Sequence, residues 1–177
     1  MATWTPPNSG SVVDADFGNT QSIGYSFYSG SNPVIGNVVT QATFRLFSSS
    51  TPGSFTISCR IYDSSGNLQE TSTNTIDANL IPSGGAVYTF TFAGSHTIAL
   101  QDYIAVTPGD SSFAVLMSMK NSGATSYSGC RQTAGSAPTF FSPERFPTDV
   151  TVTYSAPAPP PASGGTRLPP PPAFVRF

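Results

Sequence analysis

The chain has 177 residues, of which 38% are hydrophobic, 12% aromatic and only 9% charged, and its formal net charge is −2. Binding to nucleic-acid phosphates needs clustered cations, and the seven lysines and arginines are scattered, so we expect no nucleic-acid binding. No run approaches the roughly 18 apolar residues of a membrane helix, so we expect no membrane span.

Residues 1–19 are predicted to form an N-terminal arm. Its start lacks the cationic and apolar stretches of a signal peptide, which favours a virion protein; if a signal was removed, an exported cell-surface protein fits equally well. Trp4, Tyr28, Tyr62 and Tyr127 are candidates for binding a glycan by stacking. Trp4 could instead pack against a neighbour. Asp14, Asp16 and Asn19 offer oxygen ligands for a structural calcium, which Asp102, Asp110 or Asp149 could complete. The alternative is a group of solvated or capping aspartates.

Residues 20–155 are predicted to form one domain built from short strands. Apolar side chains alternate with polar ones, and Gly, Pro, Ser and Asn separate the runs, whereas no segment shows a helical period. The pattern predicts an all-β antiparallel sandwich, similar to a jelly roll, with a hairpin turn at 63–67 and a polar edge strand at 68–77. The expected strands are 22–29, 38–47, 54–62, 68–77, 87–92, 96–100, 103–107, 113–120 and 148–154. Residues 123–147 are predicted to be an irregular loop or lid.

Cys59 falls in the alternating run 55–61 and is predicted to point into the core. It is either a buried free thiol or half of a disulfide with Cys130. His96 is the only histidine and no nucleophile elbow accompanies it, so we interpret it as a turn or surface residue. Glu70 and Glu144 are the only glutamates, and neither context suggests a glycosidase. We therefore expect a protein that is not an enzyme and has no catalytic residue.

Five runs of the body resemble jelly-roll modules of microbial surface proteins and of phage or archaeal virion proteins. They are IGYSF at 23–27, ATFRLF at 42–47, CRIYDSSGN at 59–67, YTFTF at 88–92 and DYIAV at 102–106. The resemblance implies a fold and a surface setting, and it carries no catalytic residue with it.

Residues 156–177 form a tail with eight prolines. Proline cannot donate to a sheet or continue a helix, so the tail is expected to be extended polyproline II with a hinge at Gly164-Gly165. The β-prone segment 173–177 follows the second proline run. We predict that it adds as a strand to a sheet edge of a neighbouring subunit, such as the polar edge at 68–77. The expected interface residues are Pro169, Pro170, Pro171, Pro172, Phe174, Val175, Arg176 and Phe177.

The sequence therefore predicts a structural subunit that self-assembles into a virion component or an extracellular filament. A disordered tail, or a tail folded back on its own domain, are the competing interpretations of 156–177. The alternative function is a carbohydrate-binding or adhesive surface module that uses Trp4 or Tyr127.

Overall fold

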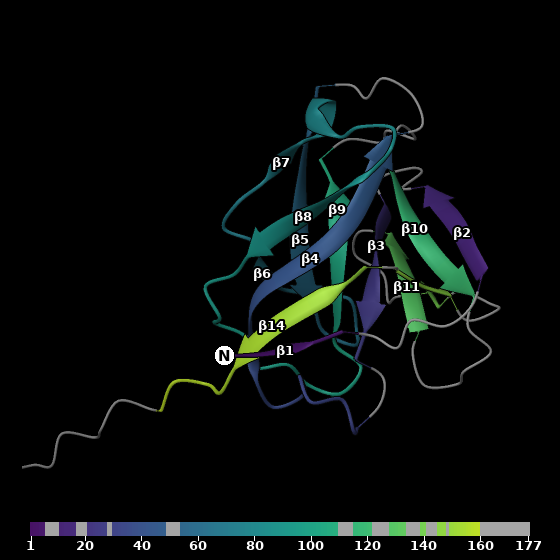
Figure 1. Cartoon of the computed structure of the whole chain (residues 1–177). Coiled ribbons are helices and arrows are strands. Elements are labelled where there is room, and N and C mark those ends of the chain that lie inside the picture. Colours follow the sequence, from purple (N-terminus) through teal and green to yellow (C-terminus); the bar gives the residue numbers. More distant parts are fainter. Residues whose placement is uncertain are drawn as a thin grey trace, which may run out of the picture.

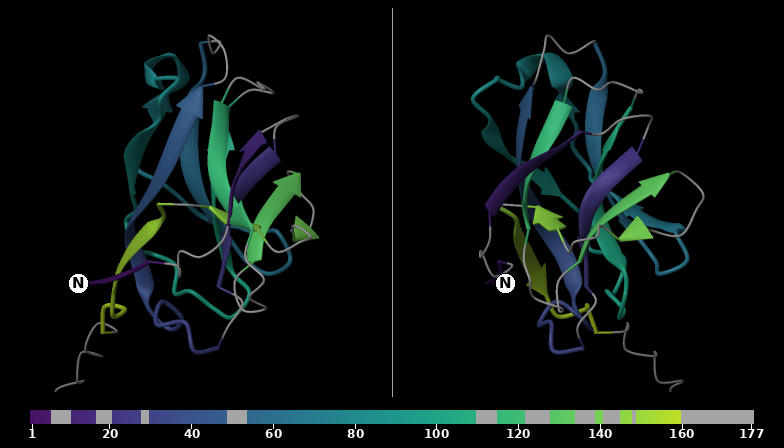
Figure 2. Two further views of the ribbon diagram at one scale, coloured as in Figure 1. Left: turned by 45° about the vertical axis from the view of Figure 1, so that its right-hand side comes forward. Right: turned by 90° about the vertical axis from the view of Figure 1, so that its right-hand side faces the viewer.

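Two antiparallel sheets form a β-sandwich, as the alternating pattern predicts (Figure 1). The structure is a computed structural model that describes residues 1–5, 11–16, 21–27, 30–48, 54–109, 115–121, 128–133, 139–140, 145–147 and 149–159. Within these residues there is no α-helix, only a 3-10 turn, η1 (Ala78–Leu80), and no helix that could cross a membrane. The two views in Figure 2 show the sheets side by side, with the N-terminus at one end of the sandwich.

Sheet A is organised around β4 (Val38–Ser48), its longest strand. Ala42 faces Phe90 on one side and Val152 on the other, so β8 and β14 flank β4. On this second side, β14 pairs with β4 as far as residue 43, and β10 pairs with residues 46–48 of β4. The other strands of sheet A are β1 (Ala2–Trp4), β2 (Ser11–Asp16), β8 (Ala86–Thr91), β10 (Val115–Asn121), β13 (Arg145–Pro147) and β14 (Thr151–Ser155).

Sheet B has the order β12-β11-β3-β9-β5-β6, and β7 pairs with the start of β5. The short strand β6 is its edge, as expected for the polar segment after the hairpin turn. Its strands are β3 (Gln21–Ser26), β5 (Thr56–Tyr62), β6 (Leu68–Thr71), β7 (Ile76–Asp77), β9 (Tyr103–Pro108), β11 (Ser128–Thr133) and β12 (Thr139–Phe140).

The core lies between the sheets and follows the predicted alternation. Burying alternate residues of each strand removes apolar surface from water at roughly 25 cal/mol per Å², the main favourable term in folding. The inward side chains of the central strands are fully or almost fully buried: Ile23, Tyr25 and Phe27; Ala42, Phe44 and Leu46; Ile57, Cys59 and Ile61; Ile104 and Val106; Val150 and Val152.

Three expectations about the elements are wrong. Residues 96–100 form no strand, because Thr97 makes only an isolated bridge to Val38. Residues 123–147 are not wholly irregular, because they contain β11, β12 and β13. The edge strand expected at 68–77 is broken into β6 and β7: the Ser72 hydroxyl accepts from the Cys59 N–H (3.0 Å) and donates to the Asn74 carbonyl (2.7 Å).

The N-terminal segment that the sequence suggests as an arm contributes two strands to sheet A. Ala2–Trp4 pairs with residues 152–154 of β14, and Ser11–Asp16 pairs with residues 116–121 of β10. Trp4 is carried into the sandwich, where its ring packs against Tyr25 (centroids 5.0 Å apart) and Phe27 (6.3 Å). Aromatic anchors of this kind explain how a three-residue strand is held in place.

The predicted hairpin turn joins β5 to β6 and is organised by one carboxylate. Asp63 Oδ1 accepts from the backbone N–H groups of Ser65 and Asn67, both at 2.9 Å, and Oδ2 accepts from the Asn67 and Gln69 side-chain amides at 2.9 and 3.0 Å. These bonds, above all that from the Asn67 side chain, favour the ionised form and lower the pKa of Asp63.

The lowered pKa of Asp63 predicts how the turn responds to pH. Since the folded pKa lies below the unfolded value, the turn's contribution to stability is complete above about pH 5 and is lost as pH falls through the folded pKa. We expect Asp63→Asn to lower the free energy of unfolding at neutral pH, by an amount that shrinks as the solution is acidified. Urea unfolding from pH 7 to pH 3 measures this, and Ser64→Ala in the same turn serves as a control whose effect stays constant with pH.

Candidate functional site

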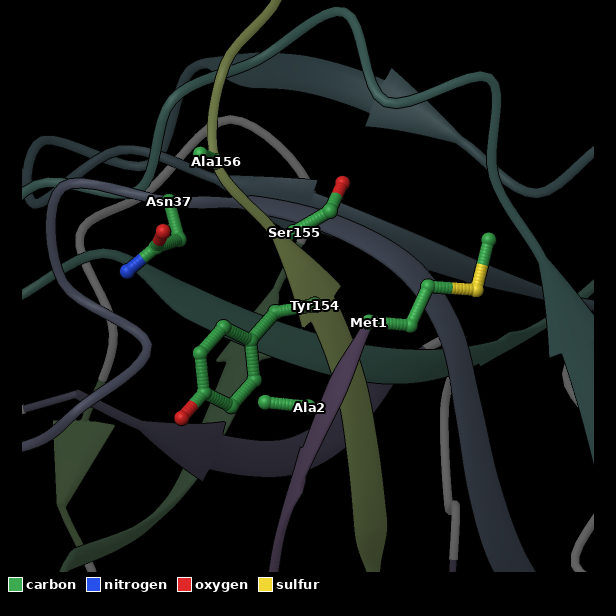
Figure 3. Close-up of a pocket in the computed structure, with 6 residues that line it drawn as sticks. All are labelled: Met1, Ala2, Asn37, Tyr154, Ser155 and Ala156. Carbon is green, nitrogen blue, oxygen red and sulfur yellow. The ribbon is translucent and has the colours of Figure 1, made fainter.

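A pocket lies where the chain leaves the last strand of sheet A (Figure 3). Its walls come from three segments: Met1 and Ala2 at the start of β1, Asn37 in the loop before β4, and Tyr154, Ser155 and Ala156 at the end of β14. Its volume is about 270 Å³. That is below the roughly 300–1,000 Å³ usual for small-molecule sites, and the hollow is largely open to solvent.

Local structure positions the polar groups of this pocket. The register of β14 on β4 shifts here: Thr153 lies opposite Gln41 and Tyr154 opposite Val39, so the extra residue of the bulge is Thr40 of β4. Tyr154 lies two residues after Val152 on the same face of β14, as the alternation predicts, and is half-buried against the core. Figure 3 shows its ring and the Asn37 amide on the same side of the β14 ribbon.

Asn37 is held by the loop that it closes. Its Nδ2 donates to the carbonyls of Pro33 (3.0 Å) and Ile35 (3.5 Å), and its backbone carbonyl accepts from the Ile98 N–H at 2.9 Å. By contrast, the hydroxyls of Tyr154 and Ser155 make no hydrogen bond within the described part of the chain. The Tyr154 and Ser155 side chains lie on opposite sides of the β14 ribbon, with Ala2 beside the first and Met1 beside the second (Figure 3), and none of the lining side chains is charged.

The edge of sheet A runs beside this pocket. Among the described residues β1 pairs with β14 alone, so the far side of Ala2–Trp4 is a sheet edge, and Met1 is 96% exposed. Sheet B has its own edge at β6, where Leu68 is 51% exposed. Exposed strand edges present unpaired N–H and C=O groups on which another strand can add.

The aromatic residues considered for glycan stacking differ in how much of each ring is exposed. Trp4 is half-buried against Tyr25 and Phe27, so its ring offers only part of its surface. Tyr62 is 5% exposed and stacks on Tyr103 with ring centroids 5.1 Å apart. Tyr28 and Tyr127 lie outside the described residues.

The aspartates considered for calcium are not brought together among the residues that can be placed. Asp14 and Asp16 lie two apart on β2, opposite Ser118 and Leu116 of β10. Asp102 is buried in another contact and Asp149 is exposed. Asn19 and Asp110 lie outside the described residues. Within the described ranges no three His, Cys, Asp or Glu side chains gather as a metal site would require.

His96 is not a simple surface residue, because it belongs to a buried polar cluster that sequence reasoning missed. Its Nε2 lies 2.7 Å from Asp102 Oδ2, and the same oxygen accepts from the Ala99 N–H at 2.8 Å. Glu70, only 7% exposed, accepts backbone N–H groups of Gly94 (2.9 Å), Ser95 and His96 (both 3.1 Å). These two carboxylates hold the segment 93–102, which links β8 of sheet A to β9 of sheet B.

Cys59 is a free thiol that points into the core, so of the two interpretations the buried cysteine is the one found. Burial raises the pKa of this thiol well above its usual value, and the opposing hydrogen bond from the Arg60 backbone is the smaller effect. A thiol kept protonated in this way is inert, which fits a packing role. Cys130 lies on β11, opposite Gly24 and Phe140.

The predicted interface residues Pro169 to Pro172, Phe174, Val175, Arg176 and Phe177 lie outside the described residues, as does Glu144. The described chain ends at Pro159, and residues 156–159 are exposed. Among the pocket residues, Tyr154 was predicted to be a core side chain, and Asn37 carries no signal beyond its place in the Pro33–Asn37 turn. Tyr154 and Asn37 meet Met1 and Ala2 only through pairing between strands that are far apart in the sequence.

No protein-family model matches the chain, and no curated protein or solved structure is detectably similar to it.

Proposed function

We propose that the protein is a structural subunit that assembles through its C-terminal tail into a virion component or an extracellular filament. In this proposal residues 173–177 add as a strand to a sheet edge of a neighbouring subunit, and the proline-rich segment bridges the two domains. The observation that supports this proposal most directly is the position at which the tail leaves the domain. β14 lies between β1 and β4 in sheet A and leads directly into the exposed residues 156–159 (Figure 1).

A tail that starts from an interior strand has a rigid attachment. β14 pairs with five residues of β4 and three of β1, namely positions 38, 39, 41, 42 and 43 and positions 2–4. A polyproline spacer is already extended, so docking it costs less conformational entropy than docking a flexible linker. At about 3.1 Å per residue in polyproline II, the roughly 17 residues between Ser155 and the terminal segment span about 50 Å, enough to reach another subunit.

The chemistry of the described surface supports packing against other copies of the subunit. Apart from Arg45 and Val87, many outward positions of β4, β8 and β14 carry neutral polar side chains, among them Gln41, Thr43, Thr89, Thr91, Thr151 and Thr153. Low net charge lowers the electrostatic repulsion between identical copies. Tail-to-neighbour docking is a heterologous contact, which gives rings when it closes and filaments when it does not.

The proposal predicts that charge in the terminal segment abolishes assembly. Phe174→Asp with Phe177→Asp in the full chain removes two apolar anchors, each worth about 1.5–3 kcal/mol when buried, so we expect association to weaken about a hundredfold or more. The matched control places the same two charges in the spacer, Ser163→Asp with Thr166→Asp, and should still assemble. Sedimentation velocity and negative-stain microscopy compare the three proteins. A full chain that stays monomeric, or a double Phe variant that assembles normally, contradicts the proposal.

A further inference from the structure

We propose that the acceptor for the tail is the outer edge of β1 together with the pocket at the end of β14, occupied by residues 169–177 of a second copy of this chain. This inference rests on the function proposed above and names the surface that the tail would use. Two features of the same corner of the molecule support it: a strand edge that is open among the described strands, and a pocket without charged side chains directly beside that edge.

The edge of β1 suits the β-prone segment 173–177. Among the described strands β1 is paired on one side only, to β14, through Ala2, Thr3 and Trp4. A strand added on the other side would extend sheet A and pair backbone groups that now face outward. Its side chains would alternate, with Ala173, Val175 and Phe177 on one face. Trp4, half-buried beside Tyr25 and Phe27, anchors the acceptor strand so that it need not be ordered on binding.

The pocket suits the proline run 169–172 that precedes this segment. Prolines offer carbonyl acceptors but no N–H, and in polyproline II these carbonyls have no internal partner. Proline-rich chains are recognised by aromatic rings combined with hydrogen-bond donors. On one side of β14 the pocket offers the Tyr154 ring with its hydroxyl and the Ala2 side chain, and on the other the Ser155 hydroxyl and the Met1 side chain (Figure 3).

The alternative acceptor, the edge of β6, is one residue longer than β1 (Ala2–Trp4), but it is closed at its end. The open stretch is the four residues Leu68–Thr71, because the chain turns away immediately after it. The Thr73 N–H donates to the Thr91 carbonyl (2.7 Å), and the Asn74 amide bonds to the carbonyl of Thr89 (2.9 Å) and the N–H of Thr91 (2.8 Å). These bonds already join the edge of sheet B to β8 of sheet A, so an added strand could not continue past Thr71.

Matched arginine substitutions in the full chain distinguish the two acceptors. Ala2→Arg places a charge at the pocket and the β1 edge, and Leu68→Arg places the same charge on β6. Both positions are exposed, so neither variant should unfold, which circular dichroism and thermal melting confirm. We expect Ala2→Arg to weaken self-association at least about tenfold, because docking the tail would bury an unpaired charge, while Leu68→Arg changes it less than about twofold. The synthetic peptide PPPPAFVRF, added in excess, should dissociate the assembly, and a scrambled peptide should not.

Each outcome of the sedimentation experiment has a definite meaning. Loss of assembly in Ala2→Arg alone supports the β1 acceptor. Loss in Leu68→Arg alone assigns the tail to β6 and overturns this inference while leaving tail-mediated assembly in place. Assembly of both variants at wild-type strength overturns it as well. A wild-type chain that is monomeric at every concentration refutes the proposed function itself, and the inference falls with it.

Discussion

Replacing Gly24 with alanine is expected to destabilise the protein by about 3 kcal/mol or more, the usual upper range for overpacking a core. Gly24 lies on β3, between β11 and β9 in the middle of sheet B, opposite Ala105. A Cβ at this position would overlap the Ile104 carbonyl oxygen and the Ala105 Cα, and would lie 2.7 Å from the Ile104 carbonyl carbon. All of these atoms are backbone, so no side chain can move aside. The overlap could be removed only if β3 moved away from β9.

Chemical or thermal unfolding of Gly24→Ala measures this loss. Gly84→Ala is the matched control, because a Cβ at Gly84 would meet no heavy atom within 4 Å, and we expect a change within about 0.5 kcal/mol there. Equal stability of the two variants would mean that β3 and β9 do not approach as closely as described.

The second large effect is expected for Glu70→Ala, which should lower the free energy of unfolding by about 3 kcal/mol. The carboxylate accepts three backbone N–H groups from residues 94–96, and hydrogen bonds to a charged group contribute roughly 1.5–3 kcal/mol each without being additive. Without it, three donors near the sandwich interior lose their acceptor. Glu70→Gln keeps one acceptor oxygen and should fall between the wild type and the alanine variant.

Hydrogen exchange locates the effect of Glu70→Ala, since the amides of Gly94, Ser95 and His96 should lose protection before those of β9. Thr71→Ala, next to Glu70 on the exposed side of β6, is the control and should change stability by less than about 0.5 kcal/mol. If the two variants unfold at the same denaturant concentration, the segment 93–102 is held by His96 and Asp102 and not by Glu70.

The fold follows from the sequence wherever alternation is strong. The runs around Phe44, Ile57 and Phe90 place apolar residues on one face, and these strands are where they were predicted. β11, with the sequence SGCRQT, has no such alternation, so pairing with β3 places it in the sheet without a local signal. The segment 96–100 shows the converse. It alternates like a strand, but Gln101 adopts a positive φ of 70° and Asp102 binds back to residues 96 and 99.

The candidate site was only half predictable. The tail is visible in the sequence because its prolines stand together, whereas the surface beside its start depends on a bulge at Thr40 of β4 and on β1 pairing with β14 across about 150 residues of sequence. Pairings between such distant segments leave no periodic pattern within either one. Glu70 illustrates the same limit, because its partners at 94–96 lie in a different loop and its polar context resembles a solvated edge.

The most direct test compares the full chain with a chain ending at Ser155, by light scattering and negative-stain microscopy. The account predicts that the full chain forms rings or filaments, while the shortened chain is a folded monomer with an unchanged melting temperature. If both are monomers of equal stability, the tail does not assemble this protein, and the account is contradicted.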